Sequence, residues 1–171
     1  MGCARKVIPL PSVDEVAAAR QDFIRRELRD LFYRVATELI DLSFRGTTAV
    51  SLAEALGVLL QTWNSQYYRF KRRDIDGQED RQARTFDEHH FRSIEQLLES
   101  NRRSIETYRG RSVGSFVSNE RGRVTLLFAP FTRVLGPVGA AKSLHLLASS
   151  FFPLWDQKIA ESLRVWQAVP K

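Results

Sequence analysis

Apolar residues recur at three- and four-residue intervals along most of the chain, which is the spacing of amphipathic helices. The first such run extends from residue 16 to residue 40. Ser12 and Glu15 form a capping box ahead of it, and Gly46 follows it as a stop signal. This pattern predicts one long helix, or two helices with a bend, reaching about Arg45.

Two further capping boxes open two more apolar runs. Ser51 and Glu54 precede a run that continues to Phe70, and residues 85–88 (TFDE) precede a run that ends at Gly110. Each of these runs predicts a helix. The polar residues 74–84 lie between them and predict a surface loop.

Another helix is predicted from about residue 123 to residue 134, and Pro130 inside it is expected to kink it. No segment alternates with the two-residue period of a strand, and the sequence contains no internal repeat. At 171 residues the chain is long enough for one domain with a hydrophobic core. The sequence therefore predicts a single compact all-α domain over residues 1–171.

The chain is basic, with 26 lysine and arginine residues against 20 aspartate and glutamate residues, and most of the excess is arginine. The guanidinium fork suits phosphate groups, so an anionic partner is expected, with nucleic acid ahead of a membrane. No stretch is predicted to be apolar for long enough to span a bilayer. The single Cys3 excludes an internal disulfide and a cysteine-rich metal site, and a cytoplasmic location is expected.

Two segments concentrate the basic residues. The first, residues 62–73 (TWNSQYYRFKRR), mixes aromatic residues with Arg69, Lys71 and Arg72. Such a mixture suits unstacked bases and phosphates. It also fits a core helix that buries Trp63 and ends in a basic turn, which the helix dipole favours.

The second basic segment spans residues 101–123 and holds six arginines against two glutamates. Arg109 and Arg111 lie near its centre, on either side of Gly110. A solvated helix end and loop would account for them. We favour a DNA-facing loop, because so many arginines beside so few acids need an anionic neighbour.

The most distinctive stretch extends from residue 134 to residue 148. Residues 135–139 (LGPVG) predict a tight turn, because glycine accepts positive φ and proline fixes its own φ. A helix beginning at about Gly139 would present free backbone N–H groups and its positive dipole end. We expect this turn to lie exposed at the edge of a basic groove. Pro153 marks the start of a further helix, over about residues 154–168, with Asp156 in its first turn.

These residues resemble the helix-hairpin-helix DNA glycosylase superfamily. The family's hairpin has an aliphatic residue, a glycine and, four positions later, a small residue, which match Val138, Gly139 and Ser143. Pro137 stands where the family has its first glycine, and Gly136 is displaced by one position. The resemblance covers about the last quarter of the chain.

The resemblance implies a DNA N-glycosylase that needs no cofactor. Such enzymes flip the target nucleotide out of the duplex, and an aspartate after the hairpin stabilises the cationic sugar; Asp156, in the sequence DQKI, matches that position. The family's lysine nucleophile would fall at Ala141, one position before Lys142, which indicates a monofunctional enzyme. The resemblance does not identify the base that is excised, and it leaves open whether the enzyme serves DNA repair or phage defence. In phage defence the target would be an enlarged cytosine.

The same resemblance implies a set of contacts with double-stranded DNA. Gly136, Val138 and Gly139 would bind one phosphate through backbone N–H groups, and Lys142 would bind a phosphate from the helix that follows. Trp155 and Trp63 could line the pocket for the flipped base. Core packing is the more frequent use of such tryptophans.

Two other functions fit parts of the sequence. Arg84 and His89 have the spacing of the arginine and histidine in all-helical HEPN ribonucleases, which resembles a metal-independent RNA-cleaving site. A non-catalytic helix-hairpin-helix DNA-binding protein would keep the hairpin, and Asp156 would then be only a helix cap. His145 is interpreted as a satisfied histidine at the edge of the core.

Overall fold

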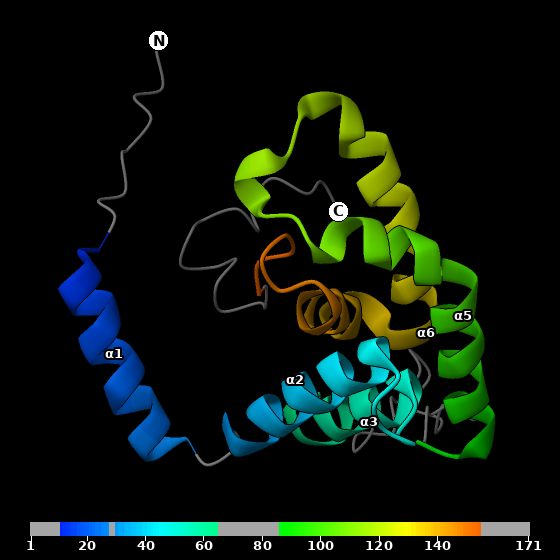
Figure 1. Cartoon of the computed structure of the whole chain (residues 1–171), viewed down its shortest axis with the longest axis horizontal. Helices are drawn as coiled ribbons and strands as arrows, with labels where there is room; N and C mark the ends of the chain where they lie inside the picture. The colour runs from blue at the N-terminus through cyan, green and yellow to red at the C-terminus, as the bar shows by residue number, and fades with distance from the viewer. Residues whose placement is uncertain (1–10, 28–29, 65–85, 155–171) are drawn as a thin grey trace, which may run out of the picture.

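The computed structural model describes residues 11–27, 30–64 and 86–154, and in this part of the chain it is all-α, without a strand, as predicted (Figure 1). The α-helices are α1 (Val13–Arg26), α2 (Asp30–Arg45), α3 (Leu52–Trp63), α5 (Glu88–Arg109) and α6 (Arg121–Leu147), and the short 3-10 turns are η1 (Val113–Ser115) and η2 (Ser118–Glu120).

Serine caps open α1 and α3, as the sequence predicts. Ser12 Oγ accepts a hydrogen bond from the Glu15 N–H at 3.2 Å, and the Glu15 carboxylate accepts from the Ser12 N–H at 2.7 Å. Ser51 and Glu54 form the same reciprocal pair at the start of α3, at 3.1 and 2.6 Å. These bonds satisfy N–H groups that the first helical turn leaves unpaired.

The end of the first predicted run also holds, whereas the start of the third does not. The first apolar run forms two helices, and Gly46, with φ of 67°, follows α2 as the stop signal requires. The third capping box was predicted with Thr85 as its cap. The cap of α5 is instead Asp87, whose Oδ1 accepts from the His90 N–H at 2.8 Å. A short carboxylate directly before the helix reaches the unpaired amides better than a threonine two residues earlier.

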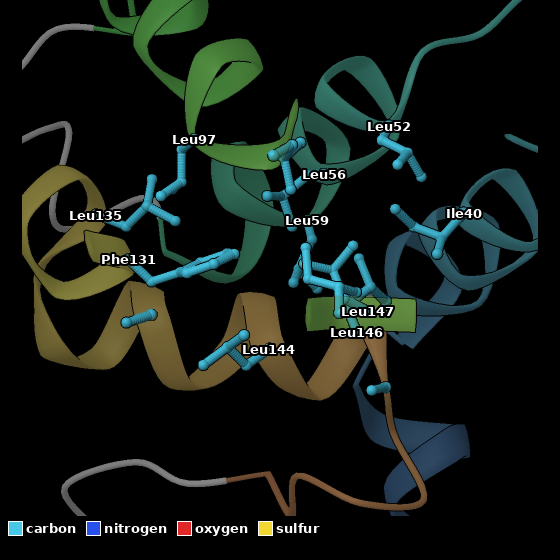
Figure 2. Close-up of a cluster of buried hydrophobic side chains, with 14 of the residues drawn as sticks. Ile40, Leu52, Leu56, Leu59, Leu97, Phe131, Leu135, Leu144, Leu146 and Leu147 are labelled. Atoms are coloured by element: carbon cyan, nitrogen blue, oxygen red, sulfur yellow. The ribbon is translucent and has the colours of Figure 1, made fainter. Parts of the chain in front are cut away.

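The core lies between α2, α3, α5 and α6, and Figure 2 shows apolar side chains from all four helices meeting there. α6 contributes Phe131, Leu135, Leu144 and Leu147, all almost fully buried. They meet Ile40 of α2, Leu56 and Leu59 of α3, and Leu97 of α5. Burial of this apolar surface is the main stabilising term of the fold.

α6 is two helical segments joined at a sharp break. Its non-helical residue is Gly136, with φ of 71° and ψ of 168°. The chain therefore breaks at Gly136, within the predicted turn, and Pro130 keeps helical dihedrals. Proline keeps a helical φ and loses one hydrogen bond, whereas the dihedrals of Gly136 cannot continue a helix. Pro137 then opens the second segment, at a position where its missing N–H costs nothing.

We expect Gly136→Ala to destabilise the protein by about 1–3 kcal/mol, because its dihedrals lie in a region that is essentially restricted to glycine. Gly122→Ala is the matched control on the same helix. A Cβ at Gly122 meets nothing within 4 Å, and alanine favours the helix, so this change should be neutral or slightly stabilising. Urea unfolding of both variants measures the difference. Equal stabilities would show that the break at Gly136 is not formed.

The helix formed by residues 118–147 is long and apolar enough, by length and composition, to cross a membrane. On this point the prediction that no stretch is apolar for long enough is wrong. The same helix supplies four large side chains to the core, and 33% of its most apolar window is buried inside the protein. The core helix of a globular protein has the same hydropathy, so this observation by itself does not place α6 in a membrane.

Candidate functional site

Several predicted site residues lie outside the described residues. They are Asp156 and Trp155 with the predicted helix over about residues 154–168, the basic residues Arg69, Lys71 and Arg72, and Arg84 of the ribonuclease pattern. His89 lies in the first turn of α5 and is exposed. The described site residues are those of the hairpin, Trp63, Lys142 and the two arginines of the second basic segment.

The predicted hairpin forms the break in α6, but its exposure differs from the expectation. Pro137 and Val138 are exposed, whereas Gly136 and Gly139 are buried. A Cβ on Gly139 would lie 2.9 Å from Asn64 Nδ2 and 3.0 Å from Leu135 Cβ. A glycine is therefore needed here for close packing against the end of α3, and the expectation of a wholly exposed turn is wrong.

Trp63 and Lys142, which are 79 residues apart, meet beside this break. The Lys142 ammonium group donates a hydrogen bond to the Trp63 carbonyl oxygen at 2.5 Å, with both residues half-buried. That carbonyl belongs to the last turn of α3, where carbonyl groups lack helical partners and a cation is favoured. Lys142 thus ties the second half of α6 to the end of α3. The predicted role of Lys142 as a phosphate contact is not one that this geometry favours.

A chain of hydrogen bonds runs from α2 through α6 to the segment after it. Tyr33 OH lies 2.8 Å from His145 Nε2, and His145 Nδ1 lies 2.8 Å from the Phe152 carbonyl oxygen. Since a carbonyl only accepts, Nδ1 carries the proton and Nε2 accepts from the tyrosine. Burial lowers the pKa of His145 and raises the pKa of Tyr33, so both side chains are neutral near pH 7.

This chain of bonds holds the backbone two residues before the end of the described segment. Aromatic rings extend it, since the Tyr33 ring lies 5.8 Å from the His145 ring and 5.9 Å from the Trp63 ring. The interpretation of His145 as a satisfied histidine at the core edge is confirmed. Sequence reasoning missed Tyr33, because one tyrosine within an apolar run carries no signal of a partner 112 residues away.

His145 should make stability depend on pH in mildly acidic solution. The folded-state pKa of His145 is lowered, so the unfolded chain binds the proton first. The stabilising contribution is complete above the ordinary histidine pKa of about 6.5 and decreases as the pH falls below it. We expect the His145→Gln variant to lose less unfolding free energy than the parent protein when the pH falls from about 7 to about 5. Exposed His89→Gln is the control, and identical pH profiles for all three proteins would contradict this assignment.

The two arginines predicted to bind DNA have internal partners. Arg109 donates to the Leu147 carbonyl at 2.8 Å and pairs with the Asp41 carboxylate, while its guanidinium lies 4.1 Å from the centre of the Phe44 ring. It therefore satisfies a carbonyl at the end of α6 and joins that end to α2. Arg109 is not a DNA-facing residue in this structure, so this part of the prediction is corrected.

Arg111 is paired in a similar way. It forms a bidentate ion pair with Glu120, at 2.6 and 2.9 Å, and donates to the Ser115 carbonyl at 2.9 Å. The guanidinium holds the pKa of Glu120 at about 2, helped by the Val117 N–H. For Arg111, the anionic neighbour predicted from the sequence to be DNA is therefore Glu120 of the protein itself.

Other arginines remain available on the surface. Arg121, Arg123 and Arg133 of α6 are exposed and have no ion pair within 4 Å among the described residues. The last of them lies one turn before Gly136 and the exposed Pro137–Val138 corner. Arg133 lies outside the two basic segments that sequence reasoning selected.

Compared with known proteins, the chain matches no family model, no curated protein and no solved structure.

One cavity among the described residues lies away from this cluster. It has a volume of about 500 Å³ and is bounded by the start of α3 and the middle of α5, including Ser51, Leu98, Glu99 and Arg102. The described residues also contain no group of three or more His, Cys, Asp or Glu side chains that could hold a metal ion. The residues that converge on the hairpin are therefore the strongest candidate site in this part of the protein.

Proposed function

We propose that this protein is a DNA glycosylase that flips a damaged or modified base out of the duplex and hydrolyses its N-glycosidic bond. Asp156 is the acid in this proposal. A carboxylate held beside the sugar stabilises the developing positive charge and orients the attacking water. The enzyme needs no cofactor for this chemistry.

The observation that carries the proposal is the break in α6 together with the anchored segment that follows it. Pro137 starts a helix whose first turn is exposed at Val138, and a helix start is a natural site for a phosphate. At the other end of this helix, His145 fixes the Phe152 carbonyl four residues before Asp156. This arrangement supports a proposal in which the helix after the break binds a DNA phosphate. Asp156, which follows that helix in sequence, would then act on the sugar.

The proposed DNA contacts are the exposed Arg121, Arg123 and Arg133 of α6 together with the Pro137–Val138 corner. Arginine forks on one helix can contact successive phosphates and set the position of the duplex without reading its sequence. Arg109 and Arg111 keep their partners within the protein and are not part of this proposed contact.

The proposed base pocket lies near Trp63 and Tyr33, on the side where the anchored segment leaves α6. Half-buried aromatic rings suit stacking on a flipped base. Lys142 contributes by fixing the backbone of Trp63 rather than by touching the DNA. Trp155, the other residue predicted for this pocket, lies outside the described residues.

A direct test is to incubate the protein with duplexes that each contain one oxidised, alkylated or deaminated base, and with phage DNA that carries enlarged cytosines. The product to score is the abasic site, revealed as a strand break after alkali. Unmodified duplex and a heat-inactivated protein are the controls. Tight binding to duplex DNA with no abasic sites on any substrate would favour the non-catalytic DNA-binding module instead.

A further inference from the structure

The cavity between α3 and α5 has a size and a lining that suit a small molecule. Its volume of about 500 Å³ falls within the range of about 300–1,000 Å³ that ligand pockets occupy. The lining is mostly apolar, with Val50, Leu52 and Ala53 before and at the start of α3 and Leu98 on α5. None of the described residues assigned to the proposed glycosylase site lines this cavity, so it needs an explanation of its own.

Two carboxylates stand on one wall of the cavity. Glu95 and Glu99 lie one turn apart on α5, and both line the cavity. Neither forms an ion pair within 4 Å in the described part of the chain. The other two glutamates of α5, Glu88 and Glu106, each pair with an arginine four positions away. Like charges one turn apart on a helix repel each other, so a cation in the cavity would stabilise this pair.

Other polar groups of the lining are already used by the fold. Ser43 Oγ lies 2.7 Å from two backbone carbonyl oxygens, and Ser51 Oγ accepts from a backbone N–H at 3.1 Å as the cap of α3. Arg102, a basic residue of the lining, pairs with Glu106, and its guanidinium carbon lies 5.7 Å from the centre of the Phe44 ring. The charge that the cavity offers to a ligand is therefore negative, although the chain has a formal net charge of +6.

We propose that this cavity binds a small organic cation, namely a protonated amine on a compact apolar body. The ammonium group would lie beside the Glu95 and Glu99 carboxylates, which accept its hydrogen bonds. The apolar body would pack on Leu52 and Leu98, where removal of apolar surface from water supplies affinity. The site goes beyond the glycosylase proposal and does not depend on it.

The test is amide NMR of the full chain with three probes of nearly the same shape, which are 2-phenylethylamine, 2-phenylethanol and phenylacetate. Fragments of this size bind pockets with dissociation constants in about the millimolar range. We expect the amine to cause saturable shifts in the amide signals of residues 51–53 and 95–102. The neutral alcohol should shift the same signals with lower affinity, and phenylacetate should not bind.

Two substitutions test the carboxylates directly. Glu95→Gln and Glu99→Gln keep the size of the side chain and remove its charge. Each should weaken amine binding by about two- to fivefold, the range of one exposed ion pair, and leave binding of the alcohol unchanged. The double variant should bind amine and alcohol equally. Glu88→Gln is the matched control, because it removes the same charge from the same helix at a residue that does not line the cavity.

Ser100→Trp tests the cavity itself. Ser100 is exposed and lines the cavity, so a large side chain there can fill the space without entering the core. It should abolish binding of both the amine and the alcohol. Four results would overturn the proposal: no saturable shifts with the amine in the millimolar range, shifts at other positions only, unchanged amine binding by Ser100→Trp, or a preference for the amine that survives in the double glutamine variant. Preferential binding of phenylacetate would assign the cavity to anions through Arg102 and also overturns it.

Discussion

Asp156→Asn should leave the fold and DNA binding intact and reduce base excision by about a hundredfold or more. The amide is nearly isosteric with the carboxylate and can still cap a helix, but it carries no charge to stabilise a sugar cation. Removing an electrostatic group of this kind typically costs about 3 kcal/mol of transition-state stabilisation. Single-turnover excision on the best substrate from the duplex panel measures this effect.

The control for this experiment is Asp87→Asn, which changes the observed cap of α5 without touching the proposed site. It should excise bases at the parental rate. If Asp156→Asn does so as well, Asp156 is a helix cap and the active site has been assigned to the wrong residue. If excision falls together with DNA binding and stability, the effect is structural and the variant does not support the catalytic role.

Lys142 gives a second check on the mechanism. A lysine nucleophile would form a Schiff base with the sugar, which borohydride traps as a covalent protein–DNA adduct. Because the Lys142 ammonium group is held by the Trp63 carbonyl, we expect no adduct. An adduct that Lys142→Ala abolishes would show a lyase activity. Loss of RNA cleavage on His89→Ala would instead identify the ribonuclease suggested by the Arg84–His89 spacing.

The parts of the fold that the sequence predicts are those set by neighbours in the chain. The caps at Ser12 and Ser51 depend on residues three positions away, and the stop at Gly46 depends on its own dihedral freedom. Helical periodicity likewise identifies most of the core positions. The break in α6 at Gly136 falls within the turn that residues 135–139 predict, because glycine accepts the positive φ that this position requires.

Two of the misassigned site residues, Arg109 and Lys142, pair over long distances in sequence, whereas Arg111 pairs with Glu120 only nine positions away. Arg109 meets Asp41 across 68 positions, and Lys142 meets the Trp63 carbonyl across 79. A count of arginines against acids within one segment cannot include partners that the fold brings from elsewhere. The same limit explains why Tyr33 was missed.

Replacing Arg121, Arg123 and Arg133 together with Gln should cause the largest loss of DNA affinity. Each arginine that contacts a phosphate contributes about 0.9 to the slope of log affinity against log salt, which at 0.1 M salt is about an eightfold loss of affinity. The triple variant should therefore bind unmodified and modified duplexes equally weakly, with a flatter salt dependence. Its unfolding free energy should stay close to that of the parent, because these side chains are exposed.

The matched control is the double variant Arg109→Gln with Arg111→Gln, in which the altered arginines have internal partners. It loses ion pairs to Asp41 and Glu120, so it should unfold more easily. The folded protein should bind DNA with the same salt dependence as the parent, because neither side chain is proposed to reach a phosphate. If the double variant flattens the salt dependence and the triple variant does not, DNA lies over the loop after α5, and the surface proposed along α6 is wrong.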